Sequence, residues 1–305
     1  MANMQPQRFK TISEFHEFRN LPKPEHPLIS VINVALINHF AGNEVSFVKD
    51  FYSISLKRNF TARMKYGQQE HDFNEGTMFF MSPGQVLKIE VEKDTKINQS
   101  GWMLLFHPDF LWHTPLAKTI KQYEYFDYSV NESLFLSDKE ETIISGIMQN
   151  IQQEYSSNID KFSQDIIIAQ IELLLTYSER FYQRQFITRK IMNHKILNHL
   201  EDVLKEYFDS GTLLKKGLPT VQYIADKLNV SSNYLSSMLK VQTGQSTQQH
   251  IHDKLIEKAK EKLSTTDLSV SEIAYELGFE HSQSFSKLFK SKTNLSPSEF
   301  RHSFN

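Results

Sequence analysis

One stretch of this chain repeats itself near the C-terminal end. Residues 221–246, VQYIADKLNVSSNYLSSMLKVQTGQS, align with residues 270–296, VSEIAYELGFEHSQSFSKLFKSKTNLS, at an offset of 49 residues that rises to 50 after one insertion near Glu280. In each copy, apolar residues at helical spacing are followed by a turn residue and a second helical pattern. This repeat predicts an all-helical domain built from two similar units.

Each copy has the layout of a helix-turn-helix, which we place at about 220–243 and 269–293. The small residues Ala225 and Ala274 allow two helices to approach closely, and Asn229 and Gly278 suit the left-handed backbone that ends a helix. The second helix of such a motif can lie in the major groove of DNA. Two hairpins that only pack on each other are the alternative. The short hydrogen-bonding side chains and lysines of the second helices favour DNA.

The segment between the copies, residues 248–263, predicts one amphipathic linker helix with Ile251, Leu255, Ala259 and Leu263 on its apolar face. A helix of this length spans about 25 Å. Together with the bodies of the motifs, it could separate the two recognition helices by one turn of DNA, ~34 Å. One chain could then enter two successive major grooves.

Length and charge indicate two domains of different character. The 305 residues, of which 39% are hydrophobic and 23% charged, suffice for two globular domains. Residues 1–187 carry 18 basic and 23 acidic residues, and the segment from Thr188 onward carries 16 and 13. The front part is therefore acidic and the back part mildly basic, as a DNA-binding domain would be, although chance unevenness of two solvated surfaces gives the same imbalance.

The front part has the pattern of a β domain followed by helices. Short strands are expected at 28–37, 45–56, 77–81, 86–91 and 101–106, and they suggest a small barrel or sandwich. Helices are expected at about 137–185, beginning with a capping box of Ser137 and Glu140. The helix at 161–185 is apolar on most faces, so its own domain, a second subunit or both must cover it. We expect an α+β chain divided into domains 1–187 and 188–305.

The composition excludes several other classes of protein. The chain has no cysteine, which excludes disulfides, thiolate zinc sites and cysteine nucleophiles. No run is apolar enough for a membrane helix, and the charged first twenty residues do not resemble a secretion signal. A cytoplasmic protein that does not contact membranes is expected.

The C-terminal sequence resembles the AraC/XylS-type transcription regulators. IAYELGFEHSQSFSKLFKSKTNLSPSEFR, residues 273–301, looks like the signature of that family, and the first copy with its linker is similar to the family's first motif. Asn294 stands where the family usually has glycine, a change that the left-handed backbone tolerates. The resemblance covers about 190–303. It implies a sequence-specific regulator that is not an enzyme, binds double-stranded promoter DNA and could contact RNA polymerase.

The front part resembles, less specifically, the cupin-like sensor barrel of many family members, through YGQQEHDFNEGTMFFMSPGQ at 66–85. The resemblance implies a small-molecule effector and a homodimer. A metal-binding cupin would carry a His-x-His pair, whereas this stretch has His71 alone, so we expect no metal and no cofactor. The alternative function is a cupin-type small-molecule enzyme with an accessory helical domain. Candidate pocket aromatics, which could equally fill the core, are Phe47, Phe51, Phe79 and Trp102.

The candidate DNA-binding residues lie on the second helix of each motif. Asn can bond adenine, Ser can contact a base or a phosphate, and Lys can neutralise a phosphate. The first motif contributes Ser231, as N-cap, with Asn233, Ser236, Ser237 and Lys240. The second contributes Ser282, Gln283, Ser284, Lys287 and Lys290. Arg301 could bond a phosphate or form a structural salt bridge, and His250 and His252 point to different helix faces, which argues against a metal pair.

Overall fold

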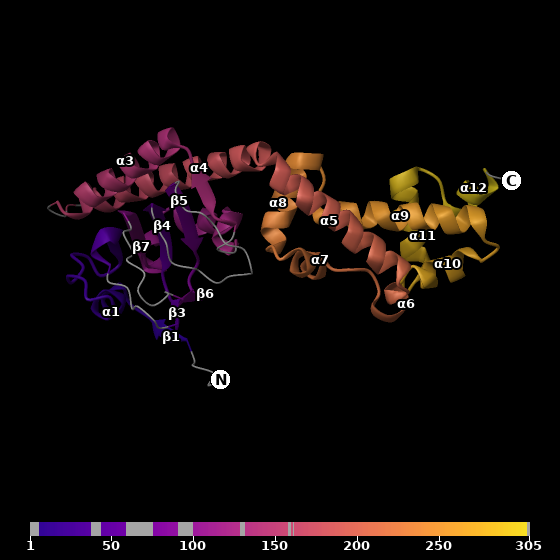
Figure 1. Cartoon of the computed structure of the whole chain (residues 1–305), viewed down its shortest axis with the longest axis horizontal. Coiled ribbons are helices and arrows are strands. Elements are labelled where there is room, and N and C mark those ends of the chain that lie inside the picture. Colours follow the sequence, from indigo (N-terminus) through magenta and orange to yellow (C-terminus); the bar gives the residue numbers. More distant parts are fainter. Residues whose placement is uncertain are drawn as a thin grey trace. The chain divides into compact units, whose positions relative to one another are not determined.

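A computed structural model describes residues 6–37, 44–58, 76–90, 100–128, 132–157, 160 and 162–303. The chain forms two compact units, Met1–Gln185 and Phe186–Asn305 (Figure 1). Sheets with covering helices make up the first unit, and the second is all-helical. The expected mixed α+β class is confirmed. The stretch 66–75, including His71, lies outside the described residues.

The strands of the first unit form two sheets. The larger sheet is antiparallel with the order β2-β7-β4-β5-β8, and in the smaller sheet, of order β1-β3-β6, β1 runs parallel to β3. The strand bounds are β1 Gln7–Phe9, β2 Ile29–Asn33, β3 Glu44–Lys49, β4 Tyr52–Arg58, β5 Gly76–Met81, β6 Val86–Glu90, β7 Ser100–Phe106 and β8 Leu134–Leu136. Among the described strands no hydrogen-bonded ring closes into a barrel.

The expected strand 45–56 is in fact two strands that belong to different sheets. The chain turns at Asp50 and Phe51, where the amide of Asp50 donates to the carbonyl of Phe9 at 3.0 Å and the Phe51 ring is fully buried. Phe51 lies in a core cluster with Phe15 and Phe47, packed by helix α1 (Ile12–Phe18) and residues of both sheets. The polar pair Lys49 and Asp50 marks this break in the sequence, but no glycine or proline accompanies it, and the stretch reads as one strand.

Two long helices complete the first unit, α3 (Asp138–Tyr155) and α4 (Ser163–Thr188). The expected capping box is confirmed, since the Glu140 carboxylate accepts from the amide of Ser137 at 2.9 Å. Helix α3 contacts β2, β7 and β8, and Arg184 of α4 pairs with Glu140 at 2.6 Å. Helix α4 continues beyond the expected end at residue 185, and near this end the side-chain amide of Gln185 bonds the backbone of Phe135 and Ser133.

One face of α4 is not covered within its own unit. Ile166, Ala169 and Leu173 follow one another at spacings of three and four residues, and all are exposed. Phe162, just before the helix, extends the same stripe. We call these four residues the α4 stripe.

The second unit begins with α5 (Lys190–Asp209). A short helix, α6 (Thr212–Lys216), follows it, and Gly211 and Gly217 flank α6 with positive φ. The other helices are α7 Val221–Leu228, α8 Ser232–Thr243, α9 Thr247–Thr265, α10 Val270–Glu276, α11 Ser282–Thr293 and α12 Pro297–His302. None of the helices in the described chain has the length and apolar character to cross a membrane.

Candidate nucleic-acid interface

The first helix-turn-helix consists of α7 and α8. Thr220 caps α7 by accepting from the amide of Tyr223 at 3.1 Å, and Asn229 ends it with φ 54°. Ser231 is the N-cap of α8, as expected, because its hydroxyl accepts from the amide of Tyr234 at 3.2 Å. The two helices share a core that includes Ala225 and Leu235, both fully buried.

The second motif, α10 and α11, repeats this construction with different residues. Ser269 and Glu272 form a capping box at the start of α10, and the hydrogen bonds from Ser269 lower the pKa of the Glu272 carboxyl. Gly278 makes the turn with φ 81°. Phe285 and Phe289 are fully buried, and burial of each ring contributes about 1.5–3 kcal/mol. The two motifs predicted from the repeat are therefore present as helix, turn and helix.

Gly278 has a second role that the repeat alone does not reveal. A Cβ added at this position would lie 3.0 Å from the Cα of Gly217 and 3.1 Å from the carbonyl oxygen of Leu213. The loop after α6 thus packs on the turn of the second motif, and the hydroxyl of Tyr207 holds that loop by donating to the carbonyl of Gly217 at 3.0 Å. The equivalent Asn229 of the first motif carries a full side chain.

Most of the candidate side chains on α8 are partly engaged inside the unit. Asn233, Ser236 and Ser237 are half-buried, and Lys240 is exposed. The Ser236 hydroxyl lies 3.0 Å from Oγ1 of the buried Thr247 at the start of α9. Tyr234, also on α8, is buried, with its ring 5.2 Å from that of Phe186.

The candidate side chains on α11 are more accessible. Gln283, Ser284, Lys287 and Lys290 are exposed, and Ser282 is half-buried. Within the described part of the chain, the side chains of Gln283 and Lys287 form no hydrogen bond or ion pair. Among the apolar residues of the two recognition helices, Leu288 is half-buried, and the buried ones include Leu235, Leu239, Phe285 and Phe289.

Sequence reasoning missed the start of α11. The N-cap is His281, an exposed residue whose side chain accepts no hydrogen bond from the helix. No side chain therefore caps the first amides of α11, although the amide of Ser284 donates to the carbonyl of His281 at 3.1 Å, and the amino end of a helix attracts a phosphate group. The available signal was the difference between the copies, because Ser231 of the first copy aligns with His281 in the second.

Helix α9 anchors both recognition helices through one carboxylate. Asp253 accepts from the side-chain amide of Gln245, which follows α8, at 2.8 Å, and from the amino group of Lys292, near the end of α11, at 2.8 Å. Burial alone would raise the pKa of the Asp253 carboxyl, but the hydrogen bonds from Lys292 and Gln245 outweigh it, and the pKa lies below its usual value. Further ion pairs join Lys262 to Glu276 at 2.7 Å and Lys258 to Asp209 at 2.8 Å.

Three other candidate residues have structural partners. Arg301 donates to the carbonyl oxygens of Leu263 and Leu268 at 3.3 and 2.6 Å, so it ties α12 to the end of α9. His250 bonds Thr243 and His252 bonds Gln248, each at 2.9 Å, and burial lowers the pKa of both imidazoles. No group of three potential metal ligands is present among the residues that the structure describes.

The first unit encloses a cavity of about 170 Å³ between its sheets. Of the candidate pocket aromatics, Phe47 and Phe79 line it, whereas Phe51 belongs to the core beneath and Trp102 does not border it. The polar lining, which includes Lys49 and Lys57, was not predicted from the sequence.

Comparison with known proteins matches the second unit. A family model described as a helix-turn-helix domain matches residues 224–303. An uncharacterized HTH-type transcriptional regulator from the cgkA 5' region of Pseudoalteromonas carrageenovora is 36% identical over 84 residues, covering 28% of this chain and 49% of that protein. The HTH-type transcriptional activator RhaS of Escherichia coli is 37% identical over 78 residues, covering 26% of this chain and 28% of RhaS. The similarity thus spans half or less of these relatives.

Among solved structures, the C-terminal domain of the two-component response regulator yesN from Fusobacterium nucleatum is 35% identical to this chain. It matches 33% of this chain and 93% of that domain, with a TM-score of 0.29.

Proposed function

We propose, on the premise that residues 224–303 are a helix-turn-helix domain of the AraC type, that this chain is a sequence-specific DNA-binding regulator of transcription. The two recognition helices, α8 and α11, enter successive major grooves of promoter DNA. The first unit senses a small molecule and changes how well the second unit binds DNA. Such a regulator acts in the cytoplasm and catalyses no reaction.

The observation that carries this proposal is the duplicated helix-turn-helix, whose two copies are joined by the single helix α9. Both copies have a short first helix, a left-handed turn residue and a second helix with a polar outer side. A pair of hairpins that served only packing would not need the exposed side chains of Gln283 and Lys287, which form no hydrogen bond or ion pair among the described residues. The relatives that match this part of the chain are named as transcriptional regulators.

The proposed contacts divide into base readers and phosphate contacts. We assign base reading to Asn233, Ser237, Gln283 and Lys287, since amide, hydroxyl and amino groups can bond base edges in the major groove. We assign Ser282 to a base edge as well, and we assign to phosphates the residues Ser231, Ser284, Lys240 and Lys290, since hydroxyl and amino groups can bond the DNA backbone. The Ser236 hydroxyl is hydrogen-bonded to that of Thr247, so we propose that Ser236 positions α8 on α9.

The first unit is proposed to be a cupin-like effector-binding domain that also forms the dimer. Its two sheets enclose a cavity, which supports a binding role. The exposed α4 stripe supports a homodimer, because the spacing of Phe162, Ile166, Ala169 and Leu173 matches the seam of a helix pair. An effector controls the protein only by binding differently to the forms that do and do not bind DNA.

Footprinting of the full chain on genomic fragments selected by gel shift tests the proposal. We expect two protected major-groove segments about one helical turn apart on the same side of the duplex. Protection of a single segment would refute the two-groove arrangement. Absence of any shifted fragment at low ionic strength, where phosphate contacts are strongest, would refute DNA binding itself.

A further inference from the structure

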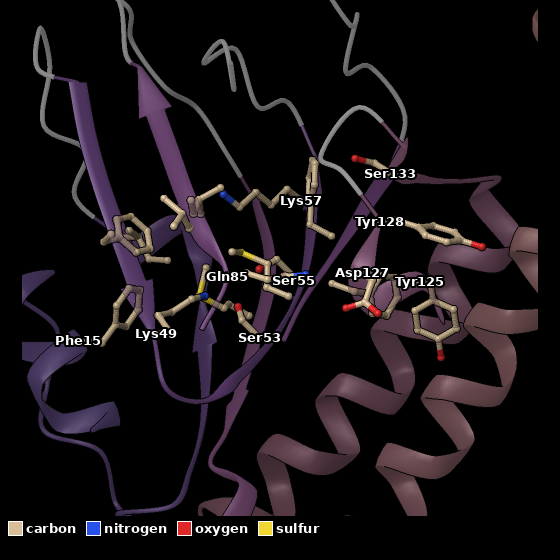
Figure 2. A pocket seen from close by; sticks show the side chains of 18 of the residues that line it. Phe15, Lys49, Ser53, Ser55, Lys57, Gln85, Tyr125, Asp127, Tyr128 and Ser133 are labelled. Carbon is tan, nitrogen blue, oxygen red and sulfur yellow. The ribbon is translucent and has the colours of Figure 1, made fainter. Parts of the chain in front are cut away.

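The cavity in the first unit has a wall that is unusual for a protein interior. Strand β4 reads YSISLKR, an alternation typical of a strand with one solvated face. Here the polar side is buried instead, because Ser53, Ser55 and Lys57 are only 2%, 6% and 6% exposed and all line the cavity. Figure 2 shows the three following one another along the same side of β4.

Two further cations reach the same space from other elements. Lys49, the last residue of β3, is 3% exposed, and Arg19, which follows α1, is 5% exposed. The amino group of Lys49 lies 5.7 Å from the centre of the Phe15 ring, and the guanidinium of Arg19 lies 5.5 Å from that of Phe47. Lys49 has no ion pair with any residue that the structure describes. A buried amino group without an anion is costly, so such a group commonly serves a binding site.

Electrostatics link these side chains to one another. Burial, followed by the charges of Lys57 and Arg19, lowers the pKa of Lys49 to about 7. Burial and the charge of Arg19 lower the pKa of Lys57 to about 7 as well. The other titratable groups of the lining are Asp127, Tyr125, Tyr128 and Tyr182, and Figure 2 shows the first three toward the opposite end of the cavity from Lys49. A negative charge placed among the cations would stabilise their charged forms.

The remaining lining is largely apolar. Phe15, Phe47, Phe79, Leu87 and Met103 form it, and Phe79 and Met103 flank Ser55 from the neighbouring strands β5 and β7. The volume of about 170 Å³ compares with the roughly 150 Å³ that accommodates benzene in an apolar protein cavity.

We propose that the cavity binds a small organic carboxylate, with the carboxylate held by Lys49, Lys57 and Arg19 and an apolar body about the size of one six-membered ring packed against the phenyl groups. This assignment rests on the proposed sensing role of the first unit and specifies the class of effector. Ser53 and Ser55 provide hydroxyl groups for the carboxylate oxygens that face β4.

The proposal predicts that binding of the carboxylate is coupled to proton uptake by the protein. Apolar packing of the ligand alone would not produce this coupling. In the unliganded protein both lysines lose their protons near pH 7, and a bound carboxylate raises their pKa. Binding therefore takes up protons at pH 7–8. Affinity is greatest below the unliganded pKa and falls as the pH rises above it.

Calorimetry of the full chain with benzoate, cyclohexanecarboxylate and hexanoate, and with benzamide as a neutral isostere, tests the proposal. We expect the best carboxylate to bind at least about tenfold more tightly than benzamide, with proton uptake visible as a dependence of the heat on the buffer. Lys49→Met and Lys57→Met should each weaken carboxylate binding by at least about tenfold, while the exposed-site control Lys121→Met should not.

Three results would overturn the assignment: equal affinity for benzoate and benzamide, carboxylate binding unchanged in both lysine variants, or no binding of any carboxylate at millimolar concentration by the folded wild-type protein. A melting curve establishes that each variant is folded. A gel shift of the same samples keeps the two proposals distinct, because carboxylate binding without DNA binding would refute only the regulator. DNA binding without carboxylate binding would refute only the effector class.

Discussion

Gln283 is the single residue from which base reading can best be measured. Its side chain is exposed on α11, and an amide can form two hydrogen bonds to adenine. We expect Gln283→Ala to weaken binding to the preferred sequence by about 1–3 kcal/mol and binding to random DNA very little. Fluorescence anisotropy on both DNAs measures this difference, with Gln153→Ala on α3 as the exposed control. Equal losses on the two DNAs would make Gln283 a positioning residue.

Lys49 makes the folding stability depend on pH in a definite direction. Its pKa is about 7 in the folded protein and about 10.4 in an unfolded chain. Between these values the unfolded state binds more protons, so the contribution of Lys49 to stability rises with pH, and below pH 7 its full cost applies.

We therefore expect Lys49→Met to raise the free energy of unfolding at pH 7 by on the order of a few kcal/mol and to flatten its rise toward pH 10. Urea denaturation across this range measures both effects, with Lys121→Met as the control. A less stable variant would show that the amino group has a stabilising partner, and would weaken the case for a ligand site.

At the scale of elements, the structure explains a difference between the two turns. Asn229 and Gly278 occupy the same place, but only Gly278 has the backbone of another segment within 3.0 Å of where a Cβ would be. Gly244 supplies a matched control, since it has φ 77° and nothing within 4 Å. Both substitutions by alanine incur the left-handed penalty of about 1 kcal/mol.

We expect Gly278→Ala to cost about 1–3 kcal/mol more than Gly244→Ala, because the turn or the α6–α7 loop must also move. Urea denaturation of the two variants gives the comparison. Similar losses would mean that the loop yields easily and does not constrain the second motif.

The same elements show how far sequence reasoning reached. Periodicity and self-comparison predicted both motifs, their turn residues and the linker helix, because helix caps and left-handed turns depend on local residues. They did not reveal that 45–56 divides into β3 and β4, since the polar pair Lys49 and Asp50 stands between β-forming residues without a glycine or proline. Nor could alternation in β4 indicate that both of its sides are buried. Burial of the polar side depends on elements that are distant in the sequence, so Ser53, Ser55 and Lys57 were missed as cavity residues.

At the scale of the whole molecule, the α4 stripe predicts self-association. We expect Leu173→Glu to weaken the homodimer by at least about tenfold, because a carboxylate would be buried against a second apolar helix. Sedimentation equilibrium measures the dissociation constant, and Leu214→Glu, at an exposed leucine on α6, serves as the control. A wild-type chain that stays monomeric at micromolar concentration would rule out this use of the stripe.

The modest charge of the second unit predicts a moderate dependence of DNA affinity on salt. Removal of one phosphate contact lowers the slope of log K against log salt by about one. We expect Lys290→Ala to show this decrease on specific and random DNA alike, whereas Lys121→Ala leaves the slope unchanged. An affinity independent of salt would contradict the phosphate contacts altogether.

The carboxylate of Asp253 has a consequence for the DNA sites themselves. Because Lys292 of α11 and Gln245, just after α8, bond to the same residue of α9, and both recognition helices contact α9, we expect the spacing between these two helices to be fixed. One base pair inserted between the two contacted grooves shifts the second by ~3.4 Å and turns it by ~34° around the duplex axis. A change in the number of base pairs between the two contacted DNA segments should then weaken binding, as a change of a contacted base does. The DNA sites that the protein binds should therefore share one spacing.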